Sequence, residues 1–97
     1  MKYKLLEYDT VDFPNGKTGY RIQRIKDGLL GGYIQSEENL SQLGKAWVFD
    51  GAWVFGNAVV YGDARVSGNV RIYGDVKLYG DTRLTGNSWV WEGRNKE

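Results

Sequence analysis

The stretch AVVYGDARVSGNVRIYGDVKLYGDTRLTGN, residues 58–87, repeats one pattern every six residues. The same register begins at Ala46 and gives eight consecutive hexads, the last of which ends at Gly93. Gly occupies the fifth position and Asp or Asn the sixth in six of the eight hexads. The third position is aliphatic in every hexad: Val48, Val54, Val60, Val66, Ile72, Leu78, Leu84 and Val90. An internal repeat of this length governs the fold and is interpreted first.

Each hexad predicts a short strand followed by a corner. Side chains alternate across a strand, so the first and third positions share one face, which we expect to point inward. Gly permits positive φ and Asx side chains bond to their own backbone, which is typical of turns. A helix needs apolar residues at 3.6-residue spacing, and a period of six does not supply it. We therefore expect a β-solenoid in which each strand pairs with its equivalent one coil later.

Several motifs resemble a group of hexapeptide-repeat proteins from phages and prophages, some of them labelled putative acyltransferases. The motifs are KYKLL at 2–6, LGGYI at 30–34, ENLS at 38–41 and VYGDARVSGN at 60–69. The resemblance implies a left-handed parallel β-helix with three hexads, or 18 residues, in each triangular coil. It also implies a phage origin. The expected fold is therefore all-β, a β-helix of about three coils with an N-terminal hairpin-like cap.

The chain is short enough that one structural domain is expected. Residues 40–93 are predicted to form the β-helix, with LSQLGK at 40–45 as a degenerate first hexad that places Gln42 at the aliphatic position. Residues 1–39 are predicted to form the cap, with strands at 2–8 and 19–25 joined by DFPNGKT, which contains a turn signal. Ser36 is expected to cap one helical turn. Residues 94–97 form a charged tail.

Composition narrows the function. Thirteen Lys and Arg against twelve Asp and Glu give a net charge of +1, which argues against a duplex nucleic-acid binder. The sequence has no Cys, and residues 1–30 contain no apolar run typical of a signal peptide or membrane span. A cytoplasmic protein without membrane contact is expected, in the bacterial host cytoplasm if the gene belongs to a phage.

The chemistry of related folds depends on histidine. Hexapeptide-repeat acyltransferases use a His as general base, and a carbonic anhydrase of the same fold holds zinc with three His. The sequence has no His. We therefore expect no enzyme activity, no catalytic residue, no metal and no cofactor. An atypical transferase that uses Asp or Tyr is the alternative.

Corner residues one coil apart are expected to stack in columns. One column holds Lys45, Asp63 and Asp81, where the lysine would neutralise the carboxylates. Two further ladders pair Asn57 with Asp75 and Asn69 with Asn87. Turn formation is the expected role of all these residues.

One outward side of the solenoid is predicted to carry a grid of aromatic residues around one arginine. Its residues are Trp53, Phe55, Arg71, Tyr73, Trp89 and Trp91. Rows about 4.8 Å apart allow rings and the guanidinium to stack. A patch of this kind is larger than a monomer usually leaves in water. We expect it to be covered, and it is the predicted binding site.

Three covers remain open. The first is an N-terminal lid formed by Leu29, Leu30, Tyr33 and Ile34. The second is a copy of the same chain in a dimer or trimer, because interfaces favour Trp, Tyr and Arg. The third is a foreign ligand, either a host bacterial protein or a small nucleotide whose base stacks on Trp while Arg71 meets phosphate. We predict a non-enzymatic phage-type interaction module that self-associates. An anti-defence role, in which the module blocks a host protein or sequesters a signalling nucleotide, is a specialisation of this prediction.

Overall fold

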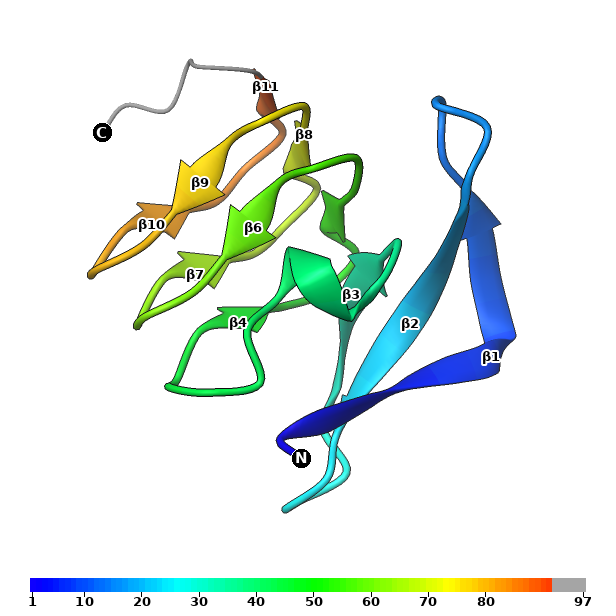
Figure 1. Cartoon of the computed structure of the whole chain (residues 1–97), viewed down its shortest axis with the longest axis vertical. Helices are drawn as coiled ribbons and strands as arrows, with labels where there is room; N and C mark the ends of the chain where they lie inside the picture. The colour runs from blue at the N-terminus through cyan, green and yellow to red at the C-terminus, as the bar shows by residue number, and fades with distance from the viewer. Residues whose placement is uncertain (92–97) are drawn as a thin grey trace.

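The computed structural model describes residues 1–91 and is a three-sided parallel β-solenoid of about three coils, joined to antiparallel strands at its N-terminal end (Figure 1). The sides are β5 (Trp53–Val54), β8 (Arg71–Tyr73) and β11 (Trp89–Trp91); β4 (Trp47–Val48), β7 (Arg65–Val66) and β10 (Arg83–Leu84); and β6 (Val59–Val60) and β9 (Lys77–Leu78). Within the hexad region each strand pairs with the equivalent strand one coil later, as in Trp47 opposite Arg65. The predicted all-β solenoid is confirmed. Its left hand stays a prediction, and the tail at 94–97 lies outside the described residues.

The interior is lined by the first and third positions of the hexads, as the repeat predicts. From Ala46 to Leu78 every one of these side chains is buried. In the last coil Leu84 and Val90 are half-buried and pack against the same core. Three short sides enclose little space. An alanine at the first position and a valine at the third are therefore enough to fill the interior of a coil.

The corners use left-handed backbone at the glycine position. Gly68 has a φ of +73°, and a Cβ built on it would lie 2.8 Å from the carbonyl oxygen of Gly86 in the next coil. In the hexad at residues 46–51, Asp50 takes this conformation in place of a glycine, with φ 58°. Its Oδ2 accepts a hydrogen bond from the Gly68 amide at 3.1 Å. Close stacking therefore requires glycine at Gly68, whereas the corner at residues 46–51 accommodates Asp50.

The N-terminal region forms strands that continue into the solenoid. β1 (Tyr3–Asp12) and β2 (Thr18–Arg24) form the predicted hairpin, and β2 pairs with β3 (Leu30–Ile34). β3 then pairs in parallel with β5, so the first side of the coil begins within the segment predicted as the cap. A Cβ on Gly32 would lie 2.2 Å from the Ala52 carbonyl oxygen, which explains a glycine in this strand. No helix in residues 1–91 has the length and hydropathy needed to cross a bilayer.

The start of the repeat differs from the prediction. Leu40, not Gln42, lies opposite Val60 and fills the aliphatic position. The Gln42 side chain instead accepts hydrogen bonds from the backbone amides of Lys2 and Tyr3 at 2.7 and 3.1 Å. The prediction that Gln42 takes the aliphatic position was therefore wrong, because Gln42 satisfies the backbone at the start of β1.

A short 3-10 helix, η1 (Glu37–Asn39), precedes Leu40 and has the predicted Ser36 cap. Asn39 is buried and makes four hydrogen bonds with its side chain. Its Oδ1 accepts from the amides of Gln35 and Ser36, and its Nδ2 donates to the carbonyls of Gly56 and Ala58. This one amide joins the first coil to the second.

Candidate binding surface

The six residues predicted as a grid lie together on the outward side of the β5, β8 and β11 sheet, which we call the aromatic face. The register places Trp53 opposite Arg71 and Arg71 opposite Trp89. In the second column Tyr73 lies opposite Trp91, and the amide of Phe55 donates to the Ile72 carbonyl at 2.9 Å. The 18-residue coil thus brings the six side chains onto one surface, and their role in binding stays a prediction.

Rings on this face form a continuous stack. Phe55 and Tyr73 are nearly parallel, with ring centroids 5.3 Å apart and an angle of 8° between the planes. Tyr73 then meets Trp89 edge-on at 5.8 Å. Offset stacked and edge-to-face pairs are the favoured geometries for aromatic rings. The stack therefore orders the side chains that the face presents.

The N-terminal region covers only the β5 end of the aromatic face, where Trp53 and Phe55 lie. Phe13, at the end of β1, lies parallel to Phe55 with centroids 4.6 Å apart and meets Trp53 edge-on at 5.3 Å. Phe13 and Phe55 are 3% and 2% exposed. The hairpin turn therefore closes the β5 end of the face.

The lid predicted from Leu29, Leu30, Tyr33 and Ile34 was wrong for three of its residues, and only Tyr33 packs with the aromatic face. Leu29 and Leu30 are exposed, and Ile34 is part of the solenoid interior. Tyr33 lies opposite Trp53 and extends the column of Trp53, Arg71 and Trp89 onto β3. The sequence signal for the true lid was an apolar residue directly before the Pro-Asn-Gly turn.

Arg71 is held within the aromatic face. Its guanidinium lies over the Trp53 ring at 4.1 Å from the centroid, and one terminal nitrogen donates to the Gly51 carbonyl at 3.0 Å. Burial lowers the pKa of Arg71 from its ordinary value, although a guanidinium stays charged at neutral pH. Arg71 therefore braces Trp53 more than it presents charge to a ligand.

Among the described residues, the aromatic face is most exposed at its β11 end. Trp89 is 55% exposed and Trp91 is 43% exposed, and both lie on β11. Within residues 1–91 no strand pairs with the outer edges of β11, β10 and β9. Two large exposed rings therefore coincide with the last strand of the longest sheet.

The remaining sides carry smaller features. Asn57 donates to Asp75 at 3.3 Å and Asn69 to Asn87 at 3.2 Å, which confirms both predicted ladders. The stacking of the third corner is also present, because the Lys45 amide donates to the Gly62 carbonyl and the Asp63 amide to the Gly80 carbonyl. No ion pair joins Lys45 to Asp63 within the described chain. These side chains therefore shape the corners.

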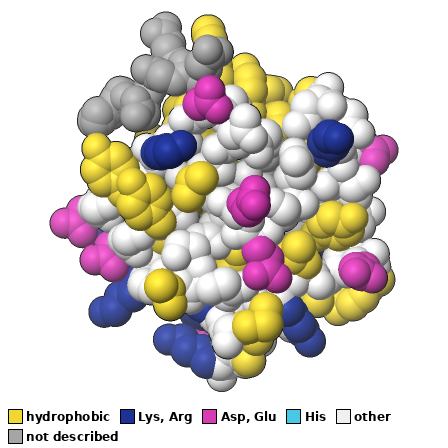
Figure 2. All heavy atoms as spheres, viewed as in Figure 1, with side chains coloured by type: hydrophobic (Ala, Val, Ile, Leu, Met, Phe, Trp, Pro, Cys, Tyr) yellow, Lys and Arg dark blue, Asp and Glu magenta, His cyan; other side chains and the backbone are white. Residues whose placement is uncertain are grey.

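Apolar side chains elsewhere are scattered. On the side shown in Figure 2 they form small clusters with charged side chains between them. Tyr61 and Tyr79 stack on one another at 5.5 Å, and Tyr79 is 56% exposed. Small clusters of this kind are ordinary on globular proteins. Among residues 1–91 no group of three or more His, Cys, Asp or Glu side chains is placed to hold a metal ion.

Comparison with known proteins gives no match: no protein-family model, no curated protein and no solved structure is significantly similar to this chain.

Proposed function

We propose that the protein is a non-enzymatic interaction module that self-associates through the exposed β11 end of its aromatic face. The observation that carries this proposal is the 55% exposure of the Trp89 side chain on β11, the last strand of its sheet among the described residues. Tryptophan and tyrosine dominate the binding energy of protein interfaces, because each buries a large area at low entropic cost.

The position of these rings favours a second copy of the same chain. A strand edge offers unpaired N–H and C=O groups to another strand. Two copies that meet at β11 around a two-fold axis bury both tryptophans and pair both edges, since the same patch serves on each side. A dimer therefore uses each surface once, and a trimer is the alternative assembly.

A nucleotide on the aromatic face is the weaker alternative. It requires Arg71 to meet phosphate, and this guanidinium already stacks on Trp53 and donates to the backbone. A bacterial host protein is the alternative occupant that the resemblance to phage proteins suggests, and it would use the same exposed rings. The sequence has no histidine to act as the base of a transferase, so an atypical transferase would have to use Asp or Tyr instead.

The mass of the purified protein tests the proposal. Light scattering or sedimentation over a concentration series is expected to give a dimer or trimer that dissociates on dilution. Trp89→Ala is expected to shift the mass to the monomer, while circular dichroism stays that of the parent. Tyr79→Ala removes an equally exposed ring from another side and is expected to keep the parent mass. A strict monomer at every concentration, or an unchanged Trp89→Ala assembly, overturns the proposal.

A further inference from the structure

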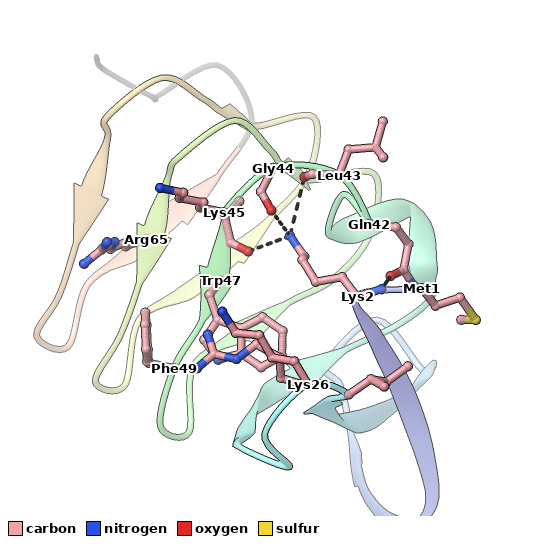
Figure 3. A pocket seen from close by; sticks show the side chains of 13 residues that line it. Met1, Lys2, Lys26, Gln42, Leu43, Gly44, Lys45, Trp47, Phe49 and Arg65 are labelled. Carbon is pink, nitrogen blue, oxygen red and sulfur yellow. Dashed lines mark hydrogen bonds between the residues drawn. The ribbon is translucent and has the colours of Figure 1, made fainter.

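A second surface, unrelated to the aromatic face, lies where the N-terminal strands meet the first coils. It is a hollow of about 1060 Å³. Its walls are the chain start before β1, the β2–β3 turn, the corner at residues 42–45, and the outward faces of β4 and β7. Figure 3 shows its lining residues, with Phe49, Lys45 and Arg65 on the solenoid and Met1 and Lys2 at the chain start. The volume lies close to the upper limit of the range for small-molecule sites.

The charge of this hollow is one-sided. Its lining includes five cationic side chains, Lys2, Arg24, Lys26, Lys45 and Arg65. No carboxylate belongs to the lining within the described chain. The protein as a whole is nearly neutral, with a net charge of +1, so this concentration of positive charge is local. A concave site lined by one sign of charge raises the local concentration of the opposite ion.

Two of the five cations are already engaged. The Lys2 ammonium donates to the carbonyls of Ala46 and Gly44 at 2.9 and 3.2 Å. Arg24 pairs with Asp27, with nitrogen and oxygen 2.8 Å apart, and lies over the Trp47 ring at 5.3 Å. These two residues therefore fix the wall of the hollow.

The other three cations are not held in ion pairs, although Lys26 lies close enough to Asp27 to help lower the pKa of that carboxyl. Within residues 1–91, Lys26, Lys45 and Arg65 form no ion pair and no side-chain hydrogen bond. They come from the β2–β3 turn, the first corner and β7, so the fold brings them together from three separate segments. Arg83 lies opposite Arg65 on the next strand and extends the positive row.

The hollow also has an aromatic part. Phe49 is half-buried and lines it, and Trp47 is buried beneath Tyr3 and Arg24. The Trp47 indole N–H is buried and has no hydrogen-bond partner among residues 1–91. A buried indole N–H normally finds an acceptor. An apolar surface beside free cations suits a molecule that is flat and apolar at one end and anionic at the other.

Electrostatics within the hollow point the same way. Burial lowers the pKa of the Lys2 ammonium, and the positive charge of Arg24 lowers it further. The field at the wall therefore already penalises a cation. An anion bound there relieves that penalty.

We infer that this hollow binds a nucleotide, with the base against Phe49 and the phosphates on Lys45 and Arg65. Base stacking on an aromatic ring tolerates any base, and arginine offers phosphate paired N–H donors. Lys26 closes the anionic end from the opposite wall. This site uses none of the residues of the aromatic face, so it stands or falls independently of self-association.

Calorimetry on the full-length protein tests the inference with four probes: ATP, GTP, CTP and UTP. Inorganic tripolyphosphate matches their anionic part, and adenosine matches the base without charge. We expect at least one nucleoside triphosphate to bind more tightly than tripolyphosphate, and adenosine to bind more weakly than ATP. The Trp47 indole N–H signal in NMR spectra is expected to move on binding, because Trp47 lines the hollow.

Variants separate the two parts of the site. Lys45→Glu and Arg65→Glu are each expected to lower the affinity for the nucleotide about ten-fold or more, which is the scale of a charge-assisted hydrogen bond. Phe49→Leu is expected to lower the affinity for the nucleotide and to leave the affinity for tripolyphosphate unchanged. Lys77→Glu on β9 makes the same charge change at an exposed residue outside the hollow and is the control.

Three outcomes overturn the inference. The first is no binding by any of the four nucleotides. The second is equal affinity for tripolyphosphate and the best nucleotide, which leaves a phosphate site without a base. The third is binding that Lys77→Glu weakens as much as Arg65→Glu, which reduces it to general charge attraction. Each outcome leaves the mass of the assembly, and so the proposed function, untouched.

Discussion

The ring of Phe13 lies parallel to the ring of Phe55, with centroids 4.6 Å apart and planes 16° apart. This contact joins the turn of the N-terminal hairpin to the outward face of the solenoid. It also decides how much of the aromatic face reaches solvent, since Phe55 is 2% exposed beneath Phe13 while Trp89, two coils away, is 55% exposed.

Phe13→Ala is expected to lower the free energy of unfolding by about 3 kcal/mol, because it removes a buried ring and leaves a cavity. Phe13→Leu keeps most of the volume and is expected to cost about 1 kcal/mol. Urea unfolding measures both values. Tyr8→Ala on the preceding strand β1, where the ring is 83% exposed, is the control. A Phe13→Ala cost no larger than that of Tyr8→Ala contradicts the packing argument.

Corner glycines separate strain from crowding. Gly80 has a φ of +60°, and a Cβ added to it would meet no atom within 4 Å, so Gly80→Ala is expected to cost about 1 kcal/mol from strain alone. A Cβ on Gly68 also meets the oxygen and nitrogen of Gly86 at 2.8 and 2.9 Å. Gly68→Ala is therefore expected to cost at least twice as much. Equal losses of unfolding free energy in denaturant contradict close stacking of the corners.

The repeat predicts the solenoid well because burial and sequence position are tied together in it. Every sixth residue from Val48 must be aliphatic to fill a narrow interior, and the Gly-Asx corners set the length of each side. Once the coil is 18 residues long, the outward columns follow by counting. This is why Trp53, Arg71 and Trp89 could be placed in one column without coordinates.

Features outside the repeat could not be found by counting. Phe13 covers Phe55 because of the angle at which the hairpin leaves the solenoid, and tertiary packing sets that angle. The hollow depends on the same packing, since its lining combines Lys26 of the N-terminal region with Lys45 of the solenoid. At Leu40 the local bonds of Asn39 decide the register, and these compete with the hexad pattern.

Asn39 provides a test of that local register. Asn39→Asp keeps the acceptor for the amides of Gln35 and Ser36 but places a carboxylate against the carbonyls of Gly56 and Ala58. At neutral pH we expect a loss of about 3 kcal/mol, since a buried carboxylate then faces two carbonyl oxygens that have lost their donor. Burial and the carbonyls raise the pKa of the new carboxyl, so the loss is expected to shrink toward about pH 4 as the group takes up a proton.

Unfolding free energies of this variant and its parent at the two pH values measure the effect. Asn39→Ala has no titrating group, and its loss is expected to stay constant between them. If Asn39→Asp and Asn39→Ala respond alike to pH, the carboxylate does not lie against the carbonyls.

Tyr3 seals the N-terminal end of the core. It is fully buried, its hydroxyl donates to the carbonyl of Leu40, and its ring meets Trp47 edge-on at 6.1 Å. Burial raises the pKa of the Tyr3 phenol, and the negative charge of Glu37 raises it further. The folded protein therefore holds the phenol proton more tightly than the unfolded chain does.

A raised folded pKa has a defined sign. The contribution of Tyr3 to stability is complete below the unfolded tyrosine pKa of about 10 and is lost as the pH rises through the folded value. Tyr3→Phe is expected to cost about 1 kcal/mol at neutral pH, where the hydrogen bond to Leu40 is lost. Above about pH 10 the parent loses stability that the variant keeps, so the difference is expected to shrink or reverse. Urea unfolding of both proteins at the two pH values measures it, because the other titrating groups are common to both and cancel. A difference that stays constant across this range would place the phenol in water and not in the core.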